Sequence, residues 1–112
     1  MTWQKAIEGY LHTQRFYLIV PPERFDEALR LYDAAKHAHK LFDVGLVDIA
    51  KVMAEEPVRL PGSLAEEIIT DNPYAQAYAD YLLGRVMKCD SVDELRKHRT
   101  GITRDGMLYL II

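Results

Sequence analysis

The pattern of apolar and polar positions predicts a strand that runs directly into a helix near the N-terminus. Residues 16–20 (FYLIV) form an aromatic and β-branched run of the kind found in buried strands. Pro21 ends this strand because proline cannot donate a hydrogen bond to a neighbouring strand, and Pro22 suits the first turn of a helix. From Phe25 to His39 apolar residues recur every three or four positions, which predicts a helix that covers the strand.

Apolar residues at helical spacing also predict helices over residues 2–12 and 43–55. The second of these has apolar residues around most of its circumference, so we expect it to be the most buried helix. Asn72 followed by Pro73 is a capping residue before a proline at the first helical position, which opens a helix to about residue 88. Two further helix starts have the spacing of the capping box, and these are Ser63 with Glu66 and Ser91 with Glu94.

The chain closes on an apolar run, residues 107–112, which we expect to form a second strand. Two isolated strands in a mainly helical protein would leave their edges unpaired, so we expect residues 16–20 to pair with residues 107–112. Residues 58–60 are the remaining segment that could add a short third strand. The sequence therefore predicts a single α+β domain over residues 1–112, with about five to six helices and a small sheet that joins its two ends.

Composition and charge narrow the class of protein. The chain has 112 residues, of which 49% are apolar and 28% charged, as in ordinary globular proteins. A net charge of −3 argues against a surface that attracts nucleic acid or anionic lipid over its whole area. One cysteine excludes an internal disulfide, and neither a membrane span nor a signal peptide is predicted, so we expect a cytoplasmic location. The scattered glycines form no phosphate-binding loop, and no cofactor is expected.

The helix after Pro73 carries the most informative predicted surface. At 100° per residue, Tyr74, Tyr78, Tyr81 and Arg85 lie along one line, while its aliphatic residues occupy a different arc. Tyrosine and arginine are enriched where proteins bind one another, so this line is a candidate binding face. The alternative is that the tyrosines form a second core face beneath a neighbouring element.

A second candidate surface is the basic segment near residue 100, which could contact phosphate groups or nucleic acid. Its cations are Arg96, Lys97, Arg99 and Arg104. The alternative explanation is structural, because lysine and arginine in the last turn of a helix interact favourably with the helix dipole. No other part of the sequence favours nucleic-acid binding.

Enzymatic and metal-binding roles receive little support from the sequence. His37 and His39 are two positions apart and point in nearly opposite directions on a helix, so they cannot hold one metal ion. Catalysis would depend on Cys89 with a histidine such as His98, and no catalytic motif surrounds it. We therefore predict a non-enzymatic domain that binds another protein, as a regulator, an inhibitor or an immunity-type partner, or that binds a second copy of itself.

Overall fold

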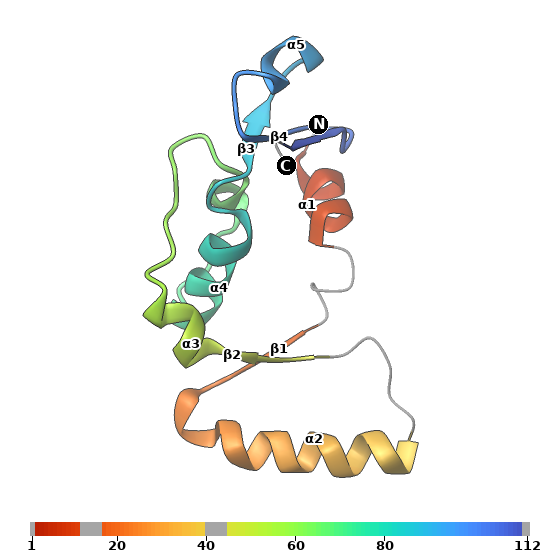
Figure 1. Ribbon diagram of the computed structural model, residues 1–112, viewed down its shortest axis with the longest axis vertical. Helices are drawn as coiled ribbons and strands as arrows, with labels where there is room; N and C mark the ends of the chain where they lie inside the picture. Colours follow the sequence, from red (N-terminus) through yellow and green to blue (C-terminus); the bar gives the residue numbers. More distant parts are fainter. Residues whose placement is uncertain (1, 12–16, 40–44, 111–112) are drawn as a thin grey trace.

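The computed structural model describes residues 2–11, 17–39 and 45–110. Its first half contains a helix, a strand, a short 3-10 turn, a long helix and a second strand. These are α1 (Gln4–Leu11), β1 (Leu18–Val20), η2 (Pro22–Arg24), α2 (Phe25–His39) and β2 (Leu46–Asp48). β1 and β2 form a two-stranded parallel sheet in which Leu18 lies opposite Leu46. Parallel neighbours need a long crossover connection, and α2 lies within it (Figure 1).

In the described residues, the second half contains three α-helices, a 3-10 helix and a three-stranded sheet. Its elements are α3 (Ile49–Ala54), η3 (Leu64–Glu67), α4 (Pro73–Leu83), β3 (Met87–Cys89), α5 (Val92–Leu95), β4 (Thr100–Thr103) and β5 (Leu108–Leu110). The strand order is β3-β4-β5, with β3 parallel to β4 and β5 antiparallel to β4. The predicted α+β class is confirmed, and no helix in the described ranges is long and apolar enough to cross a membrane.

The predicted pairing of the first strand with the last is wrong. β1 pairs with β2, and β5 pairs with β4, so the two strands belong to different sheets. The physical reason is that each strand finds a partner close along the chain, through the α2 crossover or through the turn at Asp105 and Gly106. The ends of the predicted strands, residue 16 and residues 111–112, lie outside the described residues.

The predicted helix over 43–55 is wrong in its first half. Leu46 to Asp48 form β2, and α3 begins only at Ile49, where the Asp48 side chain accepts a hydrogen bond from the Lys51 backbone N–H at 3.4 Å. α3 is also not enclosed, because Ile49 and Val52 are its buried residues and the other side chains are exposed. The apolar periodicity of this stretch thus arises from a short strand followed by a short helix. Residues 43–44 lie outside the described residues.

The capping patterns had mixed outcomes. Asn72 caps α4 as predicted, since its side chain accepts from the backbone N–H groups of Tyr74 and Ala75 at 2.9 and 3.1 Å. Neither Ser63 nor Ser91 makes a side-chain capping bond, and each is followed by a helix of 4 residues, a 3-10 helix after Ser63 and an α-helix after Ser91. The helix from Pro73 ends at Leu83 rather than near residue 88, because the chain turns at Gly84 into β3.

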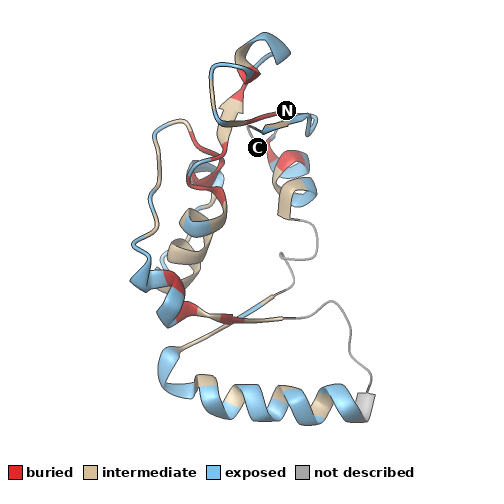
Figure 2. Cartoon of the chain, viewed as in Figure 1, coloured by how far each residue is buried: buried red, intermediate tan, exposed pale blue. Residues whose placement is uncertain are grey.

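Apolar side chains gather in two separate clusters rather than one core. The larger cluster contains Trp3, Ala6, Leu64, Ala65, Leu83, Val86 and Ile102. The smaller contains Val47, Ile49 and Val52. Figure 2 shows that α2 carries no buried residue among those it colours. The radius of gyration is 15.9 Å, whereas a compact domain of this length would have about 13 Å. The fold is therefore open, and much apolar surface stays accessible.

An extended segment, residues 58–60, and the turn that follows it lie against the end of α4 and the start of β3. The Leu60 N–H donates to the Gly84 carbonyl at 2.9 Å, and the Leu64 N–H donates to the Val86 carbonyl at 2.7 Å. Arg59 reinforces this contact through its Nε, which lies 2.8 Å from Oδ1 of Asp80. Residues 58–60 do not form the predicted strand, but Ser63 makes an isolated bridge to Met87 and so covers part of the β3 edge.

We expect Gly84→Ala to destabilise the protein by about 3 kcal/mol. A Cβ atom at this position would lie 1.7 Å from the Val58 carbonyl oxygen, so the extended segment would have to move away from α4. Gly9→Ala is the matched control, because it lies in α1 with nothing within 4 Å of the added atom. It should stabilise by about 0.5–1 kcal/mol. Chemical denaturation measures both, and equal effects would contradict the close approach.

Candidate interaction surface

The predicted tyrosine line is divided between the core and the surface. Tyr74 and Tyr78 are half-buried and pack against the small cluster around Val47. Burial raises the pKa of the Tyr78 hydroxyl, and the nearby Tyr17 and Tyr81 add to this rise. Tyr81 is 48% exposed, and Arg85 is exposed beyond the end of α4. Partner binding by these four residues stays a prediction, and its accessible part is the pair Tyr81 and Arg85.

We expect Tyr78→Ala to lower the free energy of unfolding by about 2 kcal/mol, because the half-buried ring supports the small cluster. Tyr81→Ala removes the same side chain from an exposed position one turn along and should change stability by less than about 0.5 kcal/mol. Urea denaturation of the two variants measures the difference. Similar losses in both would show that the tyrosines do not divide as described.

The cations of the basic segment also lie in two different places. Arg96, Lys97 and Arg99 are exposed in the turn between α5 and β4. Arg104 lies apart from them, with its Nη1 3.0 Å from Oδ1 of Asp90 and its guanidinium 4.8 Å from the centre of the Trp3 ring. An arginine held by a carboxylate and an indole ring is less available to an external anion. Phosphate contact by the segment stays a prediction, centred on the three exposed cations.

The hairpin that joins β4 to β5 is held by the buried Thr103 side chain. Its hydroxyl donates to the Asp105 carboxylate and accepts from the Met107 N–H at 3.1 Å. The Thr103 N–H donates to the Met107 carbonyl at 3.1 Å, and Gly106 supplies the positive φ of 95° that the turn needs. These bonds fix the position of β5 relative to the rest of the sheet.

The outer edge of β5 has no strand partner in the described part of the chain. In an antiparallel pair, hydrogen-bonded and non-hydrogen-bonded positions alternate. Because Thr103 and Met107 bond to each other, Gly101 and Tyr109 form the next bonded pair, and the backbone groups of Leu108 and Leu110 point to the open edge. Their side chains are 43% and 48% exposed. β5 therefore offers unpaired backbone groups together with apolar side chains.

We expect Thr103→Val to raise the pKa of Asp105 towards its ordinary value of 3.8. The Thr103 hydroxyl is the main cause of the lowered pKa, because it stabilises the ionised carboxylate. A lowered pKa adds stability that is fully present above the unfolded pKa and is lost as pH falls through the folded one. In the wild type this contribution therefore begins to decline as the pH falls below about 3.8. NMR titration of the carboxyl carbon measures the pKa. Thr100→Val, at the other end of β4, should leave it unchanged.

The described residues do not assemble a reactive centre around Cys89. The thiol is buried, and burial raises its pKa, which disfavours the nucleophilic thiolate. His98, its predicted base, lies in the turn after α5 and lines a surface hollow in which Cys89 takes no part. His37 faces Asp33 at 3.4 Å on α2. In residues 2–11, 17–39 and 45–110, no three His, Cys, Asp or Glu side chains come together in a way that could hold a metal ion.

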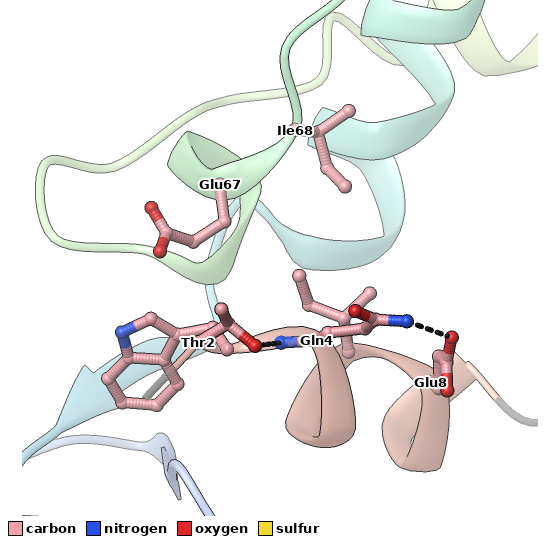
Figure 3. A pocket seen from close by; sticks show the side chains of 7 residues that line it. Thr2, Gln4, Glu8, Glu67 and Ile68 are labelled. Carbon is pink, nitrogen blue, oxygen red and sulfur yellow. Dashed lines mark hydrogen bonds between the residues drawn. The ribbon is translucent and has the colours of Figure 1, made fainter.

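A hollow between the start of α1 and η3 has a volume of about 350 Å³. Figure 3 shows Ile68 and Glu67 on one side of it and Thr2, Gln4 and Glu8 on the other. The Thr2 hydroxyl accepts from the Gln4 N–H at 3.4 Å, and the Gln4 side chain donates to Glu8 at 3.1 Å. These polar groups bond to one another, and among the described residues neither Cys89 nor a histidine lines this hollow.

Comparison with known proteins supports the description of the fold. No family model matches the chain, and no curated protein matches it. A solved structure, the crystal structure of an asymmetric dimer of the Geobacillus stearothermophilus SMC hinge domain, is similar to it with a TM-score of 0.69 and 14% identity. The match covers 96% of this chain and 48% of the other. The chain thus spans about half the length of that protein's chain, and at this identity the similarity shows the fold alone.

Proposed function

We propose that this chain is a non-enzymatic interaction domain that binds a second copy of itself through the open edge of β5. The observation that carries the proposal is the combination at Leu108 and Leu110 of half-exposed side chains with backbone groups that point away from β4. Strand edges of this kind pair readily with another strand, because both main-chain hydrogen bonds and apolar contacts become available. The hydrogen bonds of the turn at Thr103 fix the position of this edge within a single copy.

The two edges of the three-stranded sheet differ in a way that supports this choice. The β3 edge is partly covered, since Ser63 bridges to Met87 and the Lys88 N–H donates to the Gly62 carbonyl at 2.9 Å. The β5 edge lacks such cover among the described residues. The two-stranded sheet is also incomplete, with Leu18 on β1 52% exposed. A second copy would thus offer an unpaired strand edge of its own to the β5 edge.

A second copy is favoured over an unrelated protein by the similarity of the fold. The hinge domain with which this chain shares its fold was crystallised as an asymmetric dimer. An asymmetric arrangement agrees with association between unlike edges, in which β5 of one copy meets a different element of the other. A regulator, an inhibitor or an immunity-type protein would use the same edge to bind a different protein.

The test is the oligomeric state of a double variant, Leu108→Lys with Leu110→Lys. Charged side chains on an edge strand oppose strand addition, so the dimer dissociation constant should rise by about tenfold or more. Analytical ultracentrifugation over a range of concentrations measures it. At concentrations at which both proteins are monomeric, the melting temperature should hardly change, because both side chains are about half exposed in a single copy.

The matched control changes two exposed leucines elsewhere, Leu29→Lys with Leu31→Lys on α2. These side chains are 47% and 65% exposed, and the change in net charge is identical. The control should dimerise like the wild type. A wild-type protein that stays monomeric at high concentration would overturn self-association, and loss of the dimer in the α2 control alone would assign the interface to α2.

A further inference from the structure

A hollow of about 400 Å³ lies at the β3 side of the three-stranded sheet. Its half-buried apolar lining comes from Leu60 and Met87, and its exposed lining comes from Arg85, Lys97 and Arg99, with His98 between the last two. Apolar surface surrounded by cations is the arrangement that suits an anion attached to an apolar body. Arg85, which the sequence placed on the tyrosine line, therefore lies beside the exposed cations of the basic segment.

The fold brings three distant segments together at this hollow. Leu60 is fixed by its hydrogen bond to the Gly84 carbonyl, and Arg85 follows directly in the link to β3. The turn after α5 is closed by two backbone bonds, from the Lys97 N–H to the Glu94 carbonyl at 3.1 Å and from the His98 N–H to the Leu95 carbonyl at 3.2 Å. The backbone that carries the cations is thus formed before any ligand binds.

The three cations of the hollow have no ion-pair partner in the described residues, and unlike the other unpaired cations there they line one hollow together. Arg59 pairs with Asp80, Arg104 with Asp90, and Lys88 with two glutamates. Arg85, Lys97 and Arg99 have no ion pair within the described ranges. Three positive charges around one hollow repel one another, and a bound anion would relieve this repulsion.

We infer that this hollow binds a small molecule in which a phosphate group is joined to an apolar or aromatic body. Two arginines offer the forked N–H groups that match phosphate oxygens, while the lysine adds a point charge. The ligand body would lie against Leu60 and Met87. A long polyanion fits less well, because the net charge of the chain is −3 and the acidic residues of α5, Asp93 and Glu94, come just before the cations.

This site shares no residue with the proposed dimer interface. The hollow is lined by Met87 of β3 and by Thr100 at the start of β4, whereas self-association is assigned to the outer edge of β5, whose Leu110 lies opposite Thr100. A variant that loses one property should therefore keep the other. Either proposal can fail without affecting the other.

Isothermal titration calorimetry with adenosine diphosphate as the probe tests the inference. We expect a dissociation constant below about 1 mM at low salt, with weaker binding of inorganic phosphate and of adenosine, which each supply half of the interaction. Lys97→Gln with Arg99→Gln should weaken binding by about tenfold or more. Arg96→Gln with Lys36→Gln is the matched control, because it removes two exposed cations outside the hollow and should leave the affinity within about twofold.

Three results would overturn the inference. The first is the absence of measurable binding at millimolar probe. The second is an equal loss in the control variant, which would show general attraction to positive charge. The third is much tighter binding of a single-stranded oligonucleotide than of the mononucleotide, with an affinity that depends on Arg96 as much as on Lys97 and Arg99. This result would assign the cations to a nucleic-acid surface. Methyl NMR of Met87 adds a local readout, and its signal should shift on binding in the wild type.

Discussion

The close approach of the extended segment to Gly84 is the contact on which the rest of the structure depends. Because this position has no side chain, the Val58 carbonyl can lie against the end of α4, and the following residues can bond to the start of β3. This places Leu64 beside Leu83 and Val86 in the larger cluster. The same contact brings Leu60 next to Met87, which forms the apolar lining of the basic hollow. The glycine at position 84 thus allows both the packing of the larger cluster and the position of the basic hollow.

The division of the core explains why this fold leaves so much apolar surface exposed. The small cluster has three buried residues, and it supports a sheet of two short strands. A sheet this narrow cannot cover the apolar side of α2, so Leu29 remains accessible together with Leu18. Isolated two-stranded sheets are marginally stable in water. Association with another strand or another copy would therefore add both interface and stability, which is the physical argument behind the proposed self-association.

The sequence predicted those elements whose signals are local, and failed where three-residue strands follow or precede helices. The run before Pro21 and the Asn72 cap were predicted correctly, because a proline and a capping side chain act on their own neighbours. β2 was missed because Leu46 and Ile49 are spaced like residues of one helix, although they lie in different elements. β3 was missed because the apolar pattern of α4 continues past Gly84, and only contact with residues 58–64 shows that the helix must stop there.

The same limit applies to the candidate surfaces. Helical spacing placed Tyr74, Tyr78 and Tyr81 on one line of a helix, and all three lie in α4. The spacing carried no information about β2 and α3, against which Tyr74 and Tyr78 pack. Arg85 falls beyond the end of α4, so it joins Lys97 and Arg99 instead of the tyrosines. The β5 edge could not be recognised without knowing that its strand partner is β4. Because interaction surfaces are formed where elements end or remain unpaired, they depend on tertiary contacts that a periodic pattern does not record.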